Sequence, residues 1–196
     1  MLEHRLVEIS AENVQSLAWD GHDLIDWVGG GARYGLDGKN TSAHVHYAYE
    51  FDAVATSPSG EFQAIYTRLG TKGIVLRRGK VLREINRSFY HANVYEYPVA
   101  LFSLEDGREV LAHCPDDYCR LEIDDLASGE RLTGEHQRRP ADFFHSRLAA
   151  SPSGRHLLSA GWIWQPMDAV HVYDVATALT NRSYLDGAGL PLDAWA

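Results

Sequence analysis

The sequence predicts an all-β protein built from four-stranded antiparallel units that repeat about every 47 residues. Three observations favour this class. The tetrapeptide Ser-Pro-Ser-Gly occurs twice between short apolar segments, at 57–60 and at 151–154. Gly107, which ends the similar segment Leu-Glu-Asp-Gly, lies 47 residues from both Gly60 and Gly154. Within the units, segments such as "VHVYDV" and "RLEIDDL" alternate in polarity, and a period of two is typical of β-strands.

Other segments repeat in nearly the same register. Asp125 and Asp174 each follow an alternating segment and lie 49 residues apart. The segments "YEF" and "YEY", which end at Phe51 and Tyr97, are 46 residues apart, and "NRSF" and "NRSY" are 95 residues apart. Such agreement over several positions indicates a repeat architecture.

Each unit is expected to contain four strands joined by three turns. The first turn ends at the repeated glycine, the second is a polar segment such as "PDDY" or "QPMD", and the third is a tight hairpin such as "RRGK", "ASGE" or "ATAL". Four antiparallel strands in roughly 40–50 residues is the size of one β-propeller blade. We therefore expect one domain over 1–196, with a divergent first blade at 1–46, blades at about 47–89, 90–136 and 137–185, and a tail at 186–196.

The repeated unit resembles the blades of WD-repeat-like β-propellers over about residues 47–185. The resemblance rests on the Ser-Pro-x-Gly turn between two strands, followed by "IDDLASGERL" or "VYDVATAL". It implies a structural role for Asp125 and Asp174, which match the aspartate that closes the third strand in that family. The chain departs from the family in lacking the tryptophan before this aspartate and the Gly-His pair.

The repeats account for about three to four blades, and four is the lower limit of closed propellers. A small closed ring is one alternative. The favoured architecture is an incomplete or open ring, either as part of a larger propeller or as an array that pairs its edges with another chain. Because unpaired apolar edge strands promote association, we expect a homo-oligomer formed through these edges.

Charge and composition exclude several functions. The formal net charge is −9, with 27 acidic against 18 basic residues, and "LRRGKVLR" is the densest basic segment, so we expect no nucleic-acid partner. No segment approaches the roughly 18 apolar residues of a membrane span, and the N-terminus has no signal-peptide pattern. Together with only two cysteines, these features predict a cytoplasmic protein that does not bind membranes.

One cluster of histidine and tyrosine residues is the candidate site. His44 and His46 are two residues apart and would share one face of a strand, and His91 follows His44 by 47 residues. Equivalent positions of adjacent blades are neighbours around a ring, so these residues could line one rim. The predicted ligand or partner surface comprises His44, His46, Tyr47, Tyr90, His91 and Tyr95. The alternative is that they fill loops between blades.

The other motifs favour structural roles. The segment "GGGARYGLDGK" lacks the spacing of a phosphate-binding loop, so it is interpreted as a hairpin and loop. Cys114 and Cys119, with His113, could bind a metal, but they lack the usual ligand spacing and are interpreted as small buried residues. No nucleophile motif is present in the sequence.

Two further pairs of residues have either a functional or a structural interpretation. Glu50 and Glu96 are repeat-equivalent carboxylates and could act in acid–base chemistry, although residues repeated between blades are usually structural. Trp162 and Trp164 would share one strand face, either exposed as a binding site or, as we favour, packed in the blade.

The favoured function is a non-catalytic protein-interaction module with an unknown partner, and we assign no catalytic residue, metal or cofactor. This function follows from the fold alone. One alternative is a small-molecule-binding or hydrolase/lactonase-like propeller, in which Glu50, Asn93 and Glu96 would face one axial cavity. Another is a truncated propeller fragment without independent function.

Overall fold

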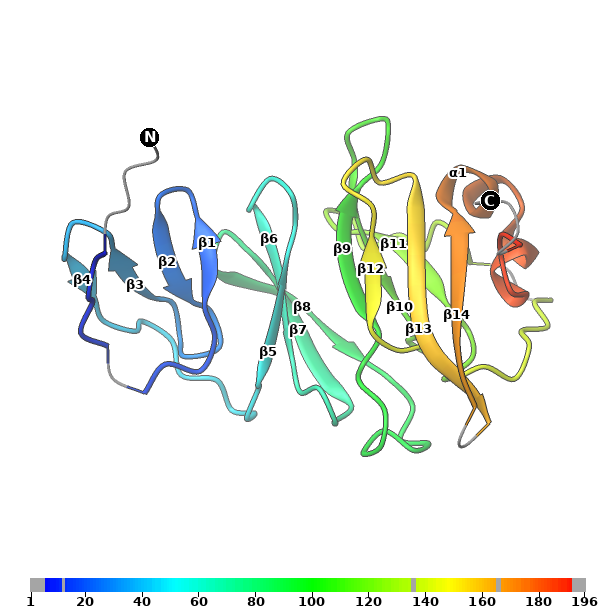
Figure 1. Ribbon diagram of the computed structural model, residues 1–196, viewed down its shortest axis with the longest axis horizontal. Coiled ribbons are helices and arrows are strands. Elements are labelled where there is room, and N and C mark those ends of the chain that lie inside the picture. Colours follow the sequence, from blue (N-terminus) through cyan, green and yellow to red (C-terminus); the bar gives the residue numbers. More distant parts are fainter. Residues whose placement is uncertain (1–5, 12, 135–136, 165–166, 192–196) are drawn as a thin grey trace.

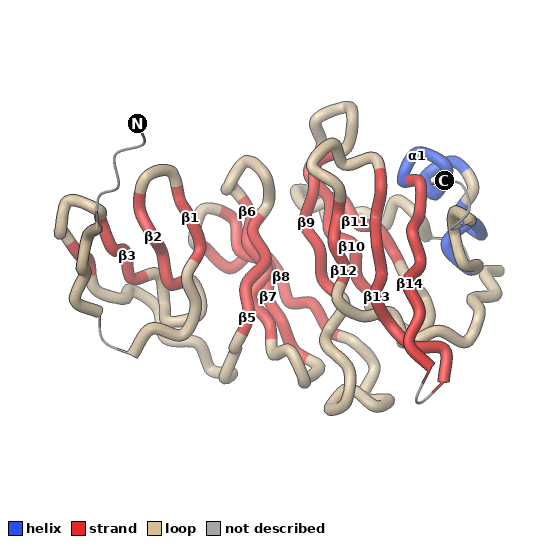
Figure 2. The backbone as a smooth tube through the Cα atoms, in the orientation of Figure 1, coloured by secondary structure: helices blue, strands red, loops and turns tan. Residues whose placement is uncertain are grey.

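The computed structural model describes residues 6–11, 13–134, 137–164 and 167–191. Within them, fourteen strands form four antiparallel sheets that follow one another along the chain. Figures 1 and 2 show the sheets side by side in a row, with the first and last sheets at opposite ends. The predicted all-β class and open, propeller-like array are confirmed.

The first two sheets have four strands each. The first contains β1 (Ala18–Asp20), β2 (Asp23–Asp26), β3 (Ala32–Gly35) and β4 (Asn40–Thr41). The second contains β5 (Ala53–Thr56), β6 (Phe62–Tyr66), β7 (Lys72–Arg77) and β8 (Lys80–Asn86). In both sheets the strands are paired in chain order, as the repeat predicted.

The last two sheets have three described strands each. The third contains β9 (Val99–Ser103), β10 (Glu109–His113) and β11 (Glu122–Asp125). The fourth contains β12 (Leu148–Ala150), β13 (His156–Trp164) and β14 (Met167–Asp174). In the third sheet a single bridge between Asp124 and Arg131 stands where a fourth strand was expected.

The repeated glycines end the turns between the first and second strands. Gly60, Gly107 and Gly154 have positive φ angles of 75°, 84° and 70°, a region that favours glycine. Each donates its amide N–H to the carbonyl oxygen three residues earlier, at 2.9, 3.0 and 2.8 Å. Gly21, with φ of 64°, occupies the same position between β1 and β2. The prediction from the 47-residue spacing is confirmed.

The predicted hairpin at "ATAL" is wrong. An α-helix, α1 (Val175–Thr180), starts there, followed by a 3-10 helix, η1 (Arg182–Asp186). Asp174 caps α1 by accepting a 2.8 Å hydrogen bond from the Thr177 amide. This segment lacks the glycine of "RRGK" and "ASGE", where Gly79 and Gly129 have positive φ, and its Ala and Leu residues favour a helix.

Two other turns were expected from the sequence, at "LDGK" and at "QPMD". "LDGK" closes the expected turn between β3 and β4, where the Gly38 amide donates to the Gly35 carbonyl at 2.9 Å. The expected turn "QPMD" falls partly on residues 165–166, which lie outside the described residues. Neither described helix is long and apolar enough to cross a membrane.

Three apolar cores join successive sheets. The first contains Ile25, Trp27, Val28, Phe51, Ile65, Ile74 and Leu76. The second contains Phe62, Ala64, Val75, Ile85, Tyr97, Val99, Leu101, Leu111 and Leu126. The third includes Phe102, Val110, Cys114, Leu121, Ile123, Leu157, Tyr173, Ala178 and Leu185. Alternate residues of the middle sheets enter different cores, which explains why β6, β7, β9 and β10 are buried on both faces.

A buried ionic network ties the third sheet to the C-terminal helices. The side chains of Glu122 and Arg138 are fully buried, and Arg138 Nη1 lies 3.2 Å from Glu122 Oε2. Arg138 also pairs with Asp186 of η1, at 2.8 Å, and donates to the Leu121 carbonyl oxygen at 2.8 Å. Thr133 donates its hydroxyl to Glu122 at 2.5 Å. The network therefore connects three segments that are distant in sequence.

The outer face of the fourth sheet is apolar and has no described sheet packed on it. Strand register places Ala149, Leu158 and Val172 in one row and Ala160 and Val170 in the next. All five are exposed or half-buried, whereas the alternate residues face the third core. The polarity alternation of "VHVYDV" in the sequence therefore corresponds to a sheet with one face uncovered.

Candidate functional site

The structure places the six predicted site residues in two groups. His44, His46 and Tyr47 lie between β4 and β5, whereas Tyr90, His91 and Tyr95 lie between β8 and β9. Among the described hydrogen bonds and ring contacts, none joins a member of one group to a member of the other. Each group contributes to a different surface feature.

Tyr90 belongs to a set of packed aromatic rings. The Phe144 ring stacks between Tyr118, at 4.1 Å between centroids, and Trp162, at 4.5 Å. Tyr90 lies 5.1 Å from Tyr118 and 5.8 Å from Phe144. Backbone pairing fixes this arrangement, because the Phe144 amide donates to the Trp162 carbonyl oxygen at 2.9 Å. His91 contacts Tyr90 and Phe144 edge-on.

The two segments that supply Tyr90 and Trp162, the loop 87–97 and the β13–β14 hairpin, also carry large exposed side chains. Phe89 is 84% exposed, Trp164 70% and Tyr90 53%. We call Phe89, Tyr90, Tyr118, Phe144, Trp162 and Trp164 the aromatic surface. Figure 1 shows this loop at the same edge of the molecule as the end of β13 and the start of β14.

A depression of about 300 Å³ separates the loop from the hairpin tip. Its lining is Leu69, Val94, Tyr95, Glu96, Ser146, Arg147, Trp162 and Asp168. Two carboxylates and one guanidinium thus lie beside the aromatic rings. A third carboxylate, Asp142, accepts a 2.6 Å hydrogen bond from the Tyr118 hydroxyl, and this bond raises the pKa of Tyr118.

Arg87 fixes the loop that carries Tyr90. It is buried, and its guanidinium donates to the carbonyl oxygens of Gly70 at 2.6 Å, Ala92 at 2.7 Å and Tyr95 at 3.0 Å. The same group lies over the Tyr95 ring, 4.5 Å from its centroid. Burial lowers the pKa of Arg87 and raises that of Tyr95 to about 12. Tyr95 is therefore part of the support beneath the aromatic surface.

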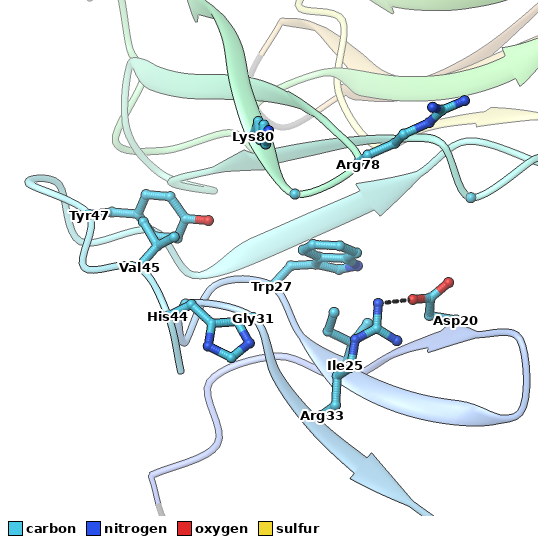
Figure 3. Close-up of a pocket in the computed structure, with 13 residues that line it drawn as sticks. Asp20, Ile25, Trp27, Gly31, Arg33, His44, Val45, Tyr47, Arg78 and Lys80 are labelled. Carbon is cyan, nitrogen blue, oxygen red and sulfur yellow. Dashed lines mark ion pairs between the residues drawn. The ribbon is translucent and has the colours of Figure 1, made fainter. Parts of the chain in front are cut away.

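The other predicted group lies at a cleft between the first and second sheets, shown in Figure 3. The cleft has a volume of about 450 Å³. Its lining is Asp20, Ile25, Trp27, Gly30, Gly31, Arg33, His44, Val45, Tyr47, Gly60, Arg78, Gly79 and Lys80. His46 lines a separate depression with Tyr47 and Glu50.

The carboxylates considered for catalysis do not share a cavity. Glu50 lines the depression beside His46, and Glu96 lines the depression beside Trp162. Asn93 lines neither of them. Within the described residues, no group of three or more His, Cys, Asp or Glu side chains has the arrangement of a metal site.

The predictions for the cysteines and for the tryptophan pair are each confirmed in part. Cys114 is buried in the third core, as expected for a small apolar residue, and this burial raises the pKa of its thiol. Cys119 is only half-buried. Trp162 packs in the aromatic set, but Trp164 is exposed, and the strand register shifts between them. Packing was predicted for both tryptophans, so the prediction is wrong for Trp164.

Tyr118 and Phe144 were not predicted as site residues, because Tyr118 was interpreted as part of the polar turn "PDDY" and Phe144 lies outside the repeated segments. Tyr118 comes from the turn between β10 and β11, and Phe144 from the segment before β12. The only available signal was the aromatic pair "FF" close to a strand.

The protein is an open β-propeller-like array. Its four-stranded and three-stranded antiparallel sheets follow one another in a row. No protein-family model matches the chain. No curated protein matches it in sequence. Among solved structures, it is similar to the β-propeller domain of Cps50 (Swd1) from Myceliophteria thermophila, with 13% identity and a TM-score of 0.48. The similarity covers 84% of this chain and 55% of that domain, so the chain spans about half of its length.

Proposed function

We propose that this protein is a non-catalytic, propeller-like module that binds a protein partner through the aromatic surface. The observation that carries the proposal is the set of packed rings that joins the half-exposed Tyr90 to Tyr118, Phe144 and Trp162, with the exposed Phe89 and Trp164 close by in sequence. Contiguous exposed apolar side chains mark interaction sites, and Trp and Tyr are enriched among the residues that dominate binding energy. The WD-repeat-like pattern of the sequence agrees with such a role.

The surroundings of the aromatic surface favour a partner segment that carries basic side chains. Glu96 and Asp168 line the depression together with Arg147, and Asp142 lies beside Tyr118. The chain as a whole has a formal net charge of −9, which would steer a basic partner toward it. Stacking of Phe144 between Tyr118 and Trp162, together with Arg87 beneath the loop, pre-orders the surface and reduces the entropy lost on binding.

We expect Trp164→Ser to weaken binding of the partner by at least about 30-fold, the effect of losing a side chain worth about 2 kcal/mol. The partner is captured with the wild-type protein from an extract of the source cells, purified, and titrated by calorimetry. Trp19→Ser is the matched control, since Trp19 is 62% exposed on β1 in the first sheet. Equal affinity of the Trp164→Ser and wild-type proteins for every captured partner would contradict the proposal.

We also propose that the protein is cytoplasmic, because its two cysteines are free and thiols stay reduced in that compartment.

We also propose that two copies associate at the open end of the array. The apolar outer face of the fourth sheet supports this, because burying it removes apolar surface from water. Light scattering at high concentration is expected to give more than one chain per particle, and Val170→Lys is expected to shift the particle to a monomer. Leu36→Lys, in the turn after β3, is the control. A monomeric wild-type protein would exclude this association.

A further inference from the structure

The cleft between the first and second sheets has two walls of different chemistry. One wall is the face of β2 and β3, with Ile25 and Arg33, and the other is the turn between β7 and β8, from Arg78 to Lys80. Figure 3 shows the Trp27 ring between them, with Tyr47 and His44 on the segment that follows β4. The volume, about 450 Å³, lies in the range of small-molecule sites.

The base of the cleft is aromatic and apolar. The Trp27 side chain is almost completely buried, and it lies beside Ile25 and Tyr47 in the lining. Its indole Nε1 is buried and has no hydrogen-bond partner among the described residues. A buried donor without an acceptor is destabilising, and an arriving acceptor would relieve this cost.

The opening of the cleft is positively charged. Arg33 is neutralised by its ion pair with Asp20. Lys80 has no ion pair among the described residues, and Arg78 reaches a carboxylate, that of Glu61, only at 3.4 Å with its own side chain largely exposed. The rim therefore carries excess positive charge, because Lys80 is unpaired among the described residues and Arg78 shares the Glu61 carboxylate with Arg77.

Two glycines permit close backbone approaches at the border of the cleft. Gly79, at the tip of the β7–β8 turn, has a φ of 75°, and a Cβ at this position would lie 3.3 Å from the Trp27 ring. Gly30 also has a positive φ, and a Cβ there would overlap the Val45 carbonyl oxygen. Because glycine has no side chain, the backbone at these two positions can lie close to its neighbours at the border of the cleft.

From this arrangement we propose that the cleft binds a small planar aromatic carboxylate. The ring packs against Trp27 and Tyr47, and the carboxylate lies toward Lys80 and Arg78, where charge-assisted hydrogen bonds form. The site goes beyond the proposed partner binding, because the aromatic surface is built from the third and fourth sheets and the loop that joins the second sheet to the third.

The test compares two probes that differ in charge, naphthalene-2-carboxylate and the neutral naphthalene-2-carboxamide. Calorimetric titration of the wild-type protein is expected to give an affinity at least about tenfold higher for the carboxylate, and this preference should decrease with added salt. Lys80→Gln is expected to remove most of the preference. Lys39→Gln, which removes the same charge from an exposed site outside the cleft, should retain it.

Two further variants locate the ring. Trp27→Phe replaces the indole by a smaller ring, and we expect weaker binding of both probes with the preference for the carboxylate retained. If Lys80→Gln proves unfolded by circular dichroism, Arg78→Gln supplies the same comparison at a largely exposed side chain. Equal affinity for both probes, no saturable binding, or equal losses in Lys80→Gln and Lys39→Gln would overturn the proposal. Trp164→Ser should not affect either probe.

Discussion

Arg138→Ala is expected to lower the free energy of unfolding by about 3–5 kcal/mol, because it breaks a buried ion pair by removing one partner. Glu122 has no exposed side-chain surface, so its carboxylate would remain buried with less compensating charge. Asp186 would lose its ion pair as well, so η1 would be held to the third sheet without this ionic link. The measurement is chemical denaturation followed by circular dichroism.

Arg139→Ala is the matched control for this network. The Arg139 side chain is exposed, and its own backbone amide, which the substitution keeps, donates to Asp186 Oδ2 at 2.9 Å. We expect a change of less than about 0.5 kcal/mol for this surface position. If Arg138→Ala lowers the free energy of unfolding as little as Arg139→Ala does, the buried network contributes little to stability.

Gly154→Ala is expected to cost about 3 kcal/mol, whereas Gly107→Ala should cost about 1 kcal/mol. Both glycines have positive φ at equivalent turns, so both substitutions carry the conformational penalty. At Gly154 a Cβ would also overlap the carbonyl oxygen of Ser103 in the neighbouring sheet, but at Gly107 it would meet no atom within 4 Å.

The difference between these two variants isolates the close approach of the third and fourth sheets at Gly154. Thermal unfolding of both variants under one set of conditions measures it. If the two substitutions cost the same, the contact between the sheets relaxes around the added methyl group, and the turn conformation alone decides the effect.

The turns could be predicted well from the sequence because each depends on a few local residues. Spacing identified Gly60, Gly107 and Gly154, and a positive φ makes glycine the favoured residue at all three positions. The third turn of the last unit was predicted wrongly as a hairpin, since its "ATAL" segment has the same repeat position but lacks the glycine. There the cap provided by Asp174 and the helix propensity of the segment decide the structure.

The candidate site could be predicted only in part. Repeat spacing paired His44 with His91, but equal spacing along the chain says nothing about which loops meet in space. Tyr90 meets Tyr118 and Phe144, which come from two other loops. A ring contact between residues so far apart in sequence depends on how the sheets pack, and no local pattern encodes it.

The division of the apolar interior into three cores has a consequence for how the molecule opens. Each core joins one sheet to the next, so the two middle sheets are each held by two cores and the end sheets by one. In such a linear array, stability is close to a sum over units and their nearest-neighbour contacts. The backbone amides of β1 to β4 should therefore exchange with solvent before those of β6, β7, β9 and β10. The chain would lose its order stepwise from its ends, with the second and third sheets as the last folded unit.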